Sequence, residues 1–326
     1  MRPFTPDDLR PDILEATISG HTTRIGVLPR MGANLISFQV DGREFIHFDA
    51  DRVLADSSHM TGCFHMFPTP CALDKGRYTF DGRDITQQKH GEVINNHGLL
   101  RDESFAIYKD GDTLTADLWW AKYDPEDDLH SREVEPMYQG FPWPGRVQIC
   151  YRLIQCGLEV SFGFQNRGSS PAPVGYGIHP FWQFTCDRAD VLVKVPAEYR
   201  LALDNYVDQN PTGELIPVAG TKYDLRQPRP LTELFIDDVF WPRPEGECAE
   251  VIFPREGLEL RIEASPSVRH LVCYSPEGRP FVCIENLTSA PDAQNLYAKG
   301  CKELSGLTIV NPGERMEAWV RYVVEG

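Results

Sequence analysis

The sequence has no run close to the roughly 20 apolar residues that a membrane-spanning helix needs. Cationic residues are also scarce, with 32 Lys and Arg against 48 Asp and Glu, a formal net charge of −16. Non-specific binding to nucleic acid requires clustered cations, and so does attraction to anionic lipid. We therefore expect neither a nucleic acid nor a membrane among the partners of this chain.

Sequence motifs for phosphate, nucleotide and metal sites are missing as well. The chain has no GxGxxG after a strand pattern, no GxxxxGK[ST], no GxSxG and no HExxH. Its nine cysteines are odd in number and show no CxxC or Cys/His ligand spacing. This pattern favours reduced core cysteines in a cytoplasmic protein. Residues 1–14 contain no apolar stretch typical of a secretory signal, and we expect neither a metal nor a cofactor.

Amphipathic helices of 12 or more residues are absent, and the dominant hydrophobic period is two. Apolar and polar residues alternate over 36–40, 158–164 and 316–324, which predicts half-buried strands. A short helix is predicted only near 292–299. The 26 Gly and 26 Pro would interrupt helices too often.

Turn pairs recur between the alternating segments and favour tight connections between antiparallel strands. They are Asp41-Gly42, Asp81-Gly82, Asp110-Gly111, Glu256-Gly257 and Glu277-Gly278. Many short strands with frequent turns predict an all-β fold, a large antiparallel β-sandwich. The polar segment 123–144 fits a long loop over one end of the sandwich better than a linker. We expect residues 1–326 to form a single domain.

Two histidines stand in local contexts that suit chemistry. His97 lies between Asn96 and Gly98, where the chain is expected to turn sharply, but His90-Gly91 has the same form. His179 precedes Pro180, which favours extended backbone, and is flanked by aromatic residues including Trp182. Aromatic faces stack on sugars, and an imidazole can transfer a proton near neutral pH. Each histidine also has an ordinary structural interpretation, as a turn or core residue.

Two glutamates occupy the ends of predicted strands, where functional sites are often built. Glu314 follows Pro312-Gly313 directly before the last alternating segment. Glu285 ends the apolar run 281–284 and is expected to be half-buried. A solvated turn carboxylate is the plain alternative for Glu314.

Taken in order, these segments resemble the aldose 1-epimerase (galactose mutarotase) family from about residue 20 to residue 323. Each motif is short, but their collinear order over the whole chain is specific. The matching segments are Gly32-Ala33-Asn34-Leu35, Asp41-Gly42, Gly76 to Gly82, His97-Gly98, Asn166, Gly177 to Trp182, Ile236 to Phe240, Cys283-Ile284-Glu285 and Pro312-Gly313-Glu314.

The resemblance implies a single-domain β-sandwich that interconverts the α and β anomers of an aldose without a cofactor. It places the catalytic glutamate on Glu314, as general base on the C1 hydroxyl, and the general acid for the ring oxygen on His179. It places a sugar-holding histidine on His97 and an acidic sugar ligand on Asp237, with Asp238 as the competing register. We expect His179, His97 and Glu314 to converge in one open cleft.

The remaining sugar ligands expected from these segments are Asn96, Trp182, Glu285, Arg77 and Arg101. The last two matter because the family commonly has an arginine where this chain has Ala72. Loss of that guanidinium removes charge-assisted hydrogen bonds, for which Arg77 or Arg101 could compensate. Arg101 after His97-Gly98 also resembles the branch acting on hexose 6-phosphates, although no Lys/Arg cluster surrounds it in the sequence.

Other functions stay open at the level of the sequence. A non-catalytic sugar-binding or sensing protein on the same fold would fit Ala72, but would not need an acid and a base. A lyase or glycosidase would need two carboxylates about 5–10 Å apart, for which Glu285 with Glu314 or Asp237 are the candidate pairs. The sugar, its phosphorylation state and the oligomeric state, monomer or dimer, are not readable from the residues.

Overall fold

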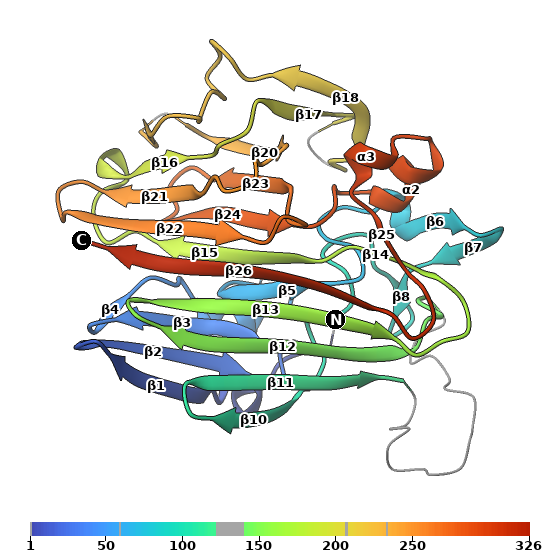
Figure 1. Ribbon diagram of the computed structural model, residues 1–326, viewed down its shortest axis with the longest axis horizontal. Helices are drawn as coiled ribbons and strands as arrows, with labels where there is room; N and C mark the ends of the chain where they lie inside the picture. Colours follow the sequence, from blue (N-terminus) through green and yellow to red (C-terminus); the bar gives the residue numbers. More distant parts are fainter. Residues whose placement is uncertain (1, 59, 122–139, 206–207, 233) are drawn as a thin grey trace.

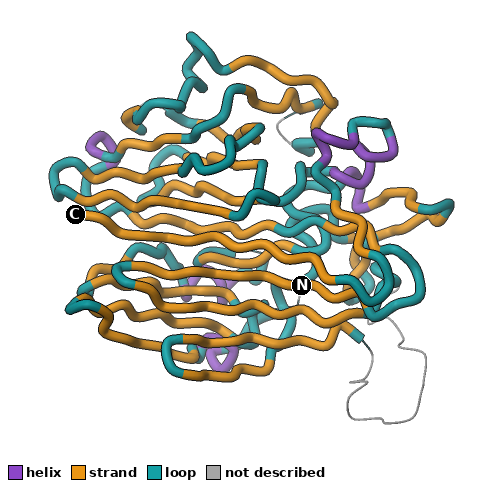
Figure 2. The backbone as a smooth tube through the Cα atoms, viewed as in Figure 1, coloured by secondary structure: helices purple, strands orange, loops and turns teal. Residues whose placement is uncertain are grey.

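The computed structural model describes residues 2–58, 60–121, 140–205, 208–232 and 234–326. Two large antiparallel sheets are packed face to face, and strands far outnumber helices (Figures 1 and 2). The all-β sandwich predicted from the alternation is therefore confirmed. The loop predicted over 123–144 falls mostly on 122–139, which lie outside the described residues.

The first sheet carries the pocket described below. In spatial order its strands are β1 (Asp12–Ile18), β2 (His21–Leu28), β3 (Asn34–Val40), β5 (Cys63–Met66), β15 (Gly177–Gln183), β24 (Phe281–Leu287), β23 (His270–Ser275), β20 (Ile236–Trp241), β17 (Tyr199–Leu203) and β18 (Pro211–Pro217), with β4 (Arg43–Glu44) paired to β3. The second sheet is formed by β10 (Ala106–Asp110), β11 (Thr113–Trp120), β12 (Gly145–Ile154), β13 (Gly157–Asn166), β26 (Arg315–Glu325), β22 (Leu258–Ala264), β21 (Ala249–Phe253), β16 (Leu192–Lys194) and β19 (Arg229–Pro230).

Smaller elements surround these two layers. Two-stranded pairs are β14 (Ala172–Val174) with β25 (Thr308–Val310), β6 (Arg77–Phe80) with β7 (Arg83–Thr86), and β8 (Gln88–Lys89) with β9 (Glu92–Val93). The α-helices are α1 (Ala50–Ala55), α2 (Ala293–Ala298) and α3 (Lys302–Ser305), and 3₁₀ turns cover Pro6–Leu9, Asp74–Gly76 and Arg188–Asp190. The β6–β7 hairpin projects at the right of Figure 1, next to α2. No helix within the described ranges is long and apolar enough to cross a membrane.

The period-two segments became strands at the predicted places. Residues 36–40 lie in β3, 158–164 in β13 and 316–324 in β26. In β26 the alternate residues from Met316 to Val324 are buried, and β26 runs between β13 and β22 (Figure 1). The predicted short helix is α2, preceded by Asp292. Asp41 and Gly42 both have positive φ, as a tight hairpin turn that matches the strand twist requires.

One hydrophobic core fills the space between the two sheets. It joins residues such as Phe38 and Trp182 from the first sheet to Phe162 and Tyr322 from the second. A second, smaller apolar cluster lies on the other face of the first sheet and includes Phe64. The single-domain organisation stays a prediction, which the shared core supports.

His65 links the two sheets through the core. It is 1% exposed, and its Nδ1 lies 2.8 Å from the Tyr176 hydroxyl and its Nε2 2.6 Å from the Tyr151 hydroxyl. Burial lowers the pKa of His65 to about 3. A neutral ring fits this contact, because one nitrogen can donate while the other accepts.

We expect acid to weaken the fold through His65. Below pH 6.5 the unfolded chain protonates this histidine and the folded chain does not, so the free energy of unfolding falls by about 1.4 kcal/mol per pH unit down to about pH 3. Urea unfolding of the wild type and His65→Gln at pH 7 and pH 4.5 checks this. The wild type should lose more stability than the variant, and parallel losses would contradict the assignment.

Candidate functional site

A pocket of about 680 Å³ opens on the outer face of the first sheet, away from the second sheet. Strands β5, β15, β24, β23 and β20 form its floor, and segments around α1, 96–101 and 279–280 form its walls. Alternation along each strand decides which side chains reach this pocket, since successive residues point to opposite faces.

Strand β15 shows the consequence of this alternation. His179 and Phe181 line the pocket, whereas Ile178 and Trp182 belong to the core between the sheets. Trp182 is fully buried and packs against Tyr322, with ring centroids 4.7 Å apart. The prediction that Trp182 binds the sugar is therefore wrong. Successive residues of a strand point to opposite faces, and Trp182 points to the core because Phe181 points to the pocket.

His179 meets Glu285 across the β15–β24 pair. Ile178 is opposite Asn286 and Phe181 opposite Cys283, which brings His179 and Glu285 to the same level. The His179 Nε2 and Glu285 Oε1 atoms are 3.1 Å apart, and both side chains are buried in the pocket floor.

Burial sets the ionisation of both groups. It lowers the pKa of His179 to about 3, and it raises the pKa of Glu285 well above its usual value, with the charge of Asp237 adding to the rise. These shifts favour one proton on the pair, held between a neutral imidazole and a carboxyl group. A single shared proton at two adjacent groups is suited to acid/base catalysis.

Cys71 supports the same carboxyl group and was missed in the sequence. Its thiol is buried and donates to Glu285 Oε2 over 3.4 Å. Burial and the nearby carboxylates raise the pKa of Cys71 well above its usual value, so the thiol keeps its proton. No local pattern marks this cysteine, because Glu285 lies more than 200 residues away along the chain.

His97 and its turn lie beside this pair. The His97 ring is 5.5 Å from that of His179 and edge-on to Phe64. The turn needs Gly98, because a Cβ there would sit 2.4 Å from the Phe67 carbonyl oxygen. Burial lowers the pKa of His97 well below its usual value, and the charge of Arg101 adds to the shift. His90, the alternative of the same form, instead contacts Asp102 outside the pocket lining.

Asn96 and Arg101 also line the pocket, as predicted for sugar ligands. The Arg101 guanidinium lies over the Phe64 ring, 5.9 Å from its centroid, and burial lowers its pKa to about 10. It stays charged at neutral pH. Ala72 lines the pocket as well.

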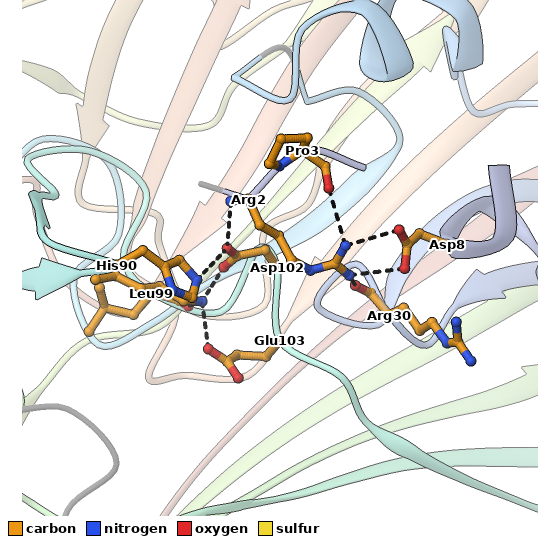
Figure 3. Close-up of polar contacts among 9 residues, drawn as sticks. Arg2, Pro3, Asp8, Arg30, His90, Leu99, Asp102 and Glu103 are labelled. Atoms are coloured by element: carbon orange, nitrogen blue, oxygen red, sulfur yellow. Dashed lines mark hydrogen bonds and ion pairs between the residues drawn. The ribbon is translucent and has the colours of Figure 1, made fainter. Parts of the chain in front are cut away.

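A buried ionic cluster anchors the segment that carries His97 and Arg101 (Figure 3). Lys89 contacts Asp102 and lies 2.5 Å from Glu103, and its ammonium donates to the Leu99 carbonyl oxygen at 2.7 Å. Burial opposes ionisation of Asp102, but the charge and hydrogen bond of Lys89, together with the contacts of Arg2 and His90, outweigh it and lower the pKa of Asp102. Arg2 joins Asp102 through its backbone amide and Asp8 through two hydrogen bonds.

The choice between Asp237 and Asp238 follows from alternation along β20. Asp237 lines the pocket with Val239, and its Oδ2 accepts a 2.6 Å hydrogen bond from Gln209. Asp238 faces the other way and pairs with Arg200 at 2.9 Å. The residue favoured in the sequence analysis is the one that the structure brings to the pocket.

Glu314 and Arg77 do not reach the pocket. Glu314 is exposed, and its Oε2 accepts hydrogen bonds from the backbone and side chain of Asn311 within one turn. That turn leads into β26 of the second sheet, so the expected convergence fails for Glu314. Arg77 is exposed on the β6–β7 hairpin. Its backbone oxygen accepts a hydrogen bond from Asn295.

The outer part of the pocket contains residues that no motif singled out. Phe181 stacks on His179 with centroids 4.7 Å apart, and Phe281 follows Phe181 at 4.9 Å. His47 then stacks on Phe281 at 5.1 Å. This row of rings extends the apolar floor from the His179–Glu285 pair toward Arg52 and Arg279, which also line the pocket.

A metal site is not evident among the residues that the structure describes. No group of three His, Cys, Asp or Glu side chains there is arranged to hold an ion. The expectation of a cofactor-free site stays a prediction.

Comparisons with known proteins agree on one family. The family model described as aldose 1-epimerase matches residues 17–323. The uncharacterised protein YihR of Escherichia coli K12 is 26% identical over 241 residues, which is 71% of this chain and 70% of that protein. Galactose mutarotase of Rattus norvegicus is 26% identical over 160 residues, 48% of this chain and 42% of that protein.

Solved structures extend the likeness of fold to the whole chain. A galactose mutarotase-like protein from Clostridium acetobutylicum superposes with a TM-score of 0.75 at 17% identity, covering 97% of this chain and 99% of its own. The Slr1438 protein of Synechocystis sp. PCC 6803 gives a TM-score of 0.75 at 19% identity, covering 100% and 99%.

Proposed function

The chain belongs to the aldose 1-epimerase family, and from this premise we propose that it interconverts the α and β anomers of a sugar, with Glu285 and His179 as its acid/base pair. The observation that carries the proposal is the 3.1 Å contact between these side chains in the pocket floor. Glu285 takes the role that the sequence analysis gave to Glu314.

The reaction needs one proton removed and one proton delivered. In the reacting form the shared proton lies on His179, across the 3.1 Å contact, and Glu285 is a carboxylate. Glu285 takes the proton from the C1 hydroxyl, and His179 gives its proton to the ring oxygen. The bond between C1 and the ring oxygen breaks, a C1 carbonyl forms, and the C1–C2 bond rotates. Ring closure on the other face of C1 reverses both transfers, so the pair ends with the protons it began with.

The geometry suits this chemistry because both reacting oxygens are bonded to the same carbon. Two groups in mutual contact can therefore reach both oxygens of one bound ring. A carboxylate beside His179 favours the imidazolium form that donates, and burial favours the neutral form that accepts on ring closure. His97, Asn96 and Asp237 are placed to hold hydroxyl groups, and Phe64 and Phe181 offer faces for the C–H side of the sugar.

Anomer exchange tests the proposal directly. NMR exchange spectroscopy on D-glucose and D-galactose, with and without protein, measures the rate at which each anomer converts. Acceleration with either sugar supports the proposal. Folded protein that accelerates none of the sugars tested, including the acidic sugars considered below, would contradict it.

Ala72 favours a second candidate, a sugar-binding or sensing protein without turnover. It lines the pocket in place of the family's arginine, so hydrogen bonds to the sugar are fewer there. Retention of the His179–Glu285 contact argues against this candidate, because binding alone does not require a paired acid and base. The nine unpaired cysteines support the further proposal of a cytoplasmic location.

A further inference from the structure

The outer end of the pocket presents two arginines on separate segments. Arg52 comes from α1, and Arg279 from the connection between β23 and β24. Both arginines act on Tyr274. Burial raises the pKa of Tyr274, Cys283 and the carboxylate of Asp237 add to the rise, and the charges of Arg279 and Arg52 oppose it. Arg279 also lies near His47. Burial lowers the pKa of His47, the charge of Asp49 opposes this shift, and the charge of Arg279 adds to it.

These guanidinium groups have no ion-pair partner within the described part of the chain, although carboxylates line the same pocket. Each of those carboxylates is engaged elsewhere. Asp49 accepts the backbone amide of Arg52 at the start of α1, over 3.0 Å. Asp237 is hydrogen-bonded to Gln209, and Glu285 contacts His179.

Unpaired arginines in a pocket need an explanation in a protein with a net charge of −16. Several other arginines of this chain meet carboxylates closely, as Arg146 meets Asp117 at 2.8 Å and Arg200 meets Asp238 at 2.9 Å, whereas half-buried Arg52 and exposed Arg279 do not. A guanidinium fork matches the oxygens of a carboxylate, sulfate or phosphate, and charge-assisted hydrogen bonds of this kind are stronger than those to hydroxyl groups.

The position of this pair relative to the catalytic end also matters. The contacting rings of Phe181, Phe281 and His47 separate His179 from the outer end, so a sugar ring above them would direct a substituent toward Arg52 and Arg279. The exocyclic carbon C6 of an aldohexose is the natural carrier, because an acidic group there leaves C1 and the ring hydroxyls free.

We infer that the pocket takes an aldose bearing an acidic group at C6, and that Arg52 and Arg279 hold this group at the outer end. The inference rests on the proposed function for the position of the ring, and it names the substrate class that the family membership leaves open. Arg101, at the catalytic end, is not part of this anion site.

Methyl glycosides test the inference without turnover, because a methylated C1 oxygen cannot be deprotonated and the ring cannot open. Calorimetric titration compares methyl α-D-glucopyranoside with its 6-carboxylate, 6-sulfate and 6-phosphate counterparts. We expect at least one acidic glycoside to bind about tenfold or more tightly than the neutral one. We also expect this preference to shrink with added salt. The ranking among the three acids identifies the shape and charge of the natural group.

Variants locate the site. Arg52→Gln combined with Arg279→Gln is expected to remove most of the preference, whereas Arg83→Gln, an exposed arginine of the β6–β7 hairpin, should keep it. Equal binding of neutral and acidic glycosides by the wild type would overturn the inference. So would a preference that survives the double variant or disappears in Arg101→Gln alone.

The proposed function and this inference fail separately. Exchange of neutral sugars without any preference for acidic glycosides overturns the anion site and leaves the epimerase intact. Preference for acidic glycosides without exchange of any anomer overturns the epimerase and leaves the anion site in place.

Discussion

Glu285→Gln is expected to slow anomer exchange by about 10²–10⁴-fold, the range in which a well-placed proton transfer contributes. The amide keeps the shape of the side chain and cannot take the proton from the C1 hydroxyl. His179→Asn should cause a loss of the same order, because the ring oxygen then leaves without a proton donor. NMR exchange spectroscopy on the sugar that the wild type exchanges fastest, at one pH and with equal amounts of folded protein, measures the rate of each variant relative to the wild type.

The control for this prediction is Glu314→Gln, the matched change at the other glutamate that the family motifs pointed to. Among the described residues its side chain bonds only Asn311, in an exposed turn that leads into the second sheet, so the variant should exchange anomers at the wild-type rate. A large loss of exchange rate in Glu314→Gln, with little loss in Glu285→Gln, would contradict the assignment and identify Glu314 as the base.

Lys89→Met is expected to lower the free energy of unfolding by about 3–5 kcal/mol, because it leaves the buried carboxylates of Asp102 and Glu103 without their central cation. The side chain of Lys89 is 3% exposed, and its ammonium touches both carboxylates and the Leu99 carbonyl oxygen. Methionine has a similar length and supplies no charge. Urea unfolding followed by tryptophan fluorescence measures the difference.

A second variant separates charge from packing in this cluster (Figure 3). Adding Asp102→Asn to Lys89→Met removes one of the uncompensated charges and should restore part of the lost stability. A loss below about 1 kcal/mol in Lys89→Met would contradict the argument, since that is the scale of an exposed ion pair. Because the same segment carries His97 and Arg101, the single variant should also weaken sugar binding.

The elements of this fold followed from local pattern. Alternation over 158–164 and 316–324 predicted β13 and β26, and Asp41-Gly42 predicted a tight hairpin. Alternation is a property of neighbouring residues, because a strand repeats every two residues whatever it pairs with. The positions of His97, His179, Asp237 and Arg101 in one pocket were likewise within reach, through short motifs in a collinear order.

The sequence could not show which of the two glutamates, Glu285 or Glu314, lies in the pocket. Glu285 follows the apolar run 281–284, Glu314 precedes the last alternating segment, and either context suits a functional carboxylate. What separates them is that β24 pairs with β15, whereas β26 pairs with β13 in the other layer. Strand order is set by contacts between residues far apart in the chain, and no local pattern records it.

The sequence by itself determined that this chain folds as an antiparallel sandwich of the aldose 1-epimerase family and which segments carry its chemistry. Only the tertiary structure decided that Glu285 meets His179, that Trp182 is core, and that Arg52 and Arg279 share one pocket. The physical reason is that the face of a strand, and the neighbour it meets there, depend on register and layer. Both are products of the whole packed core.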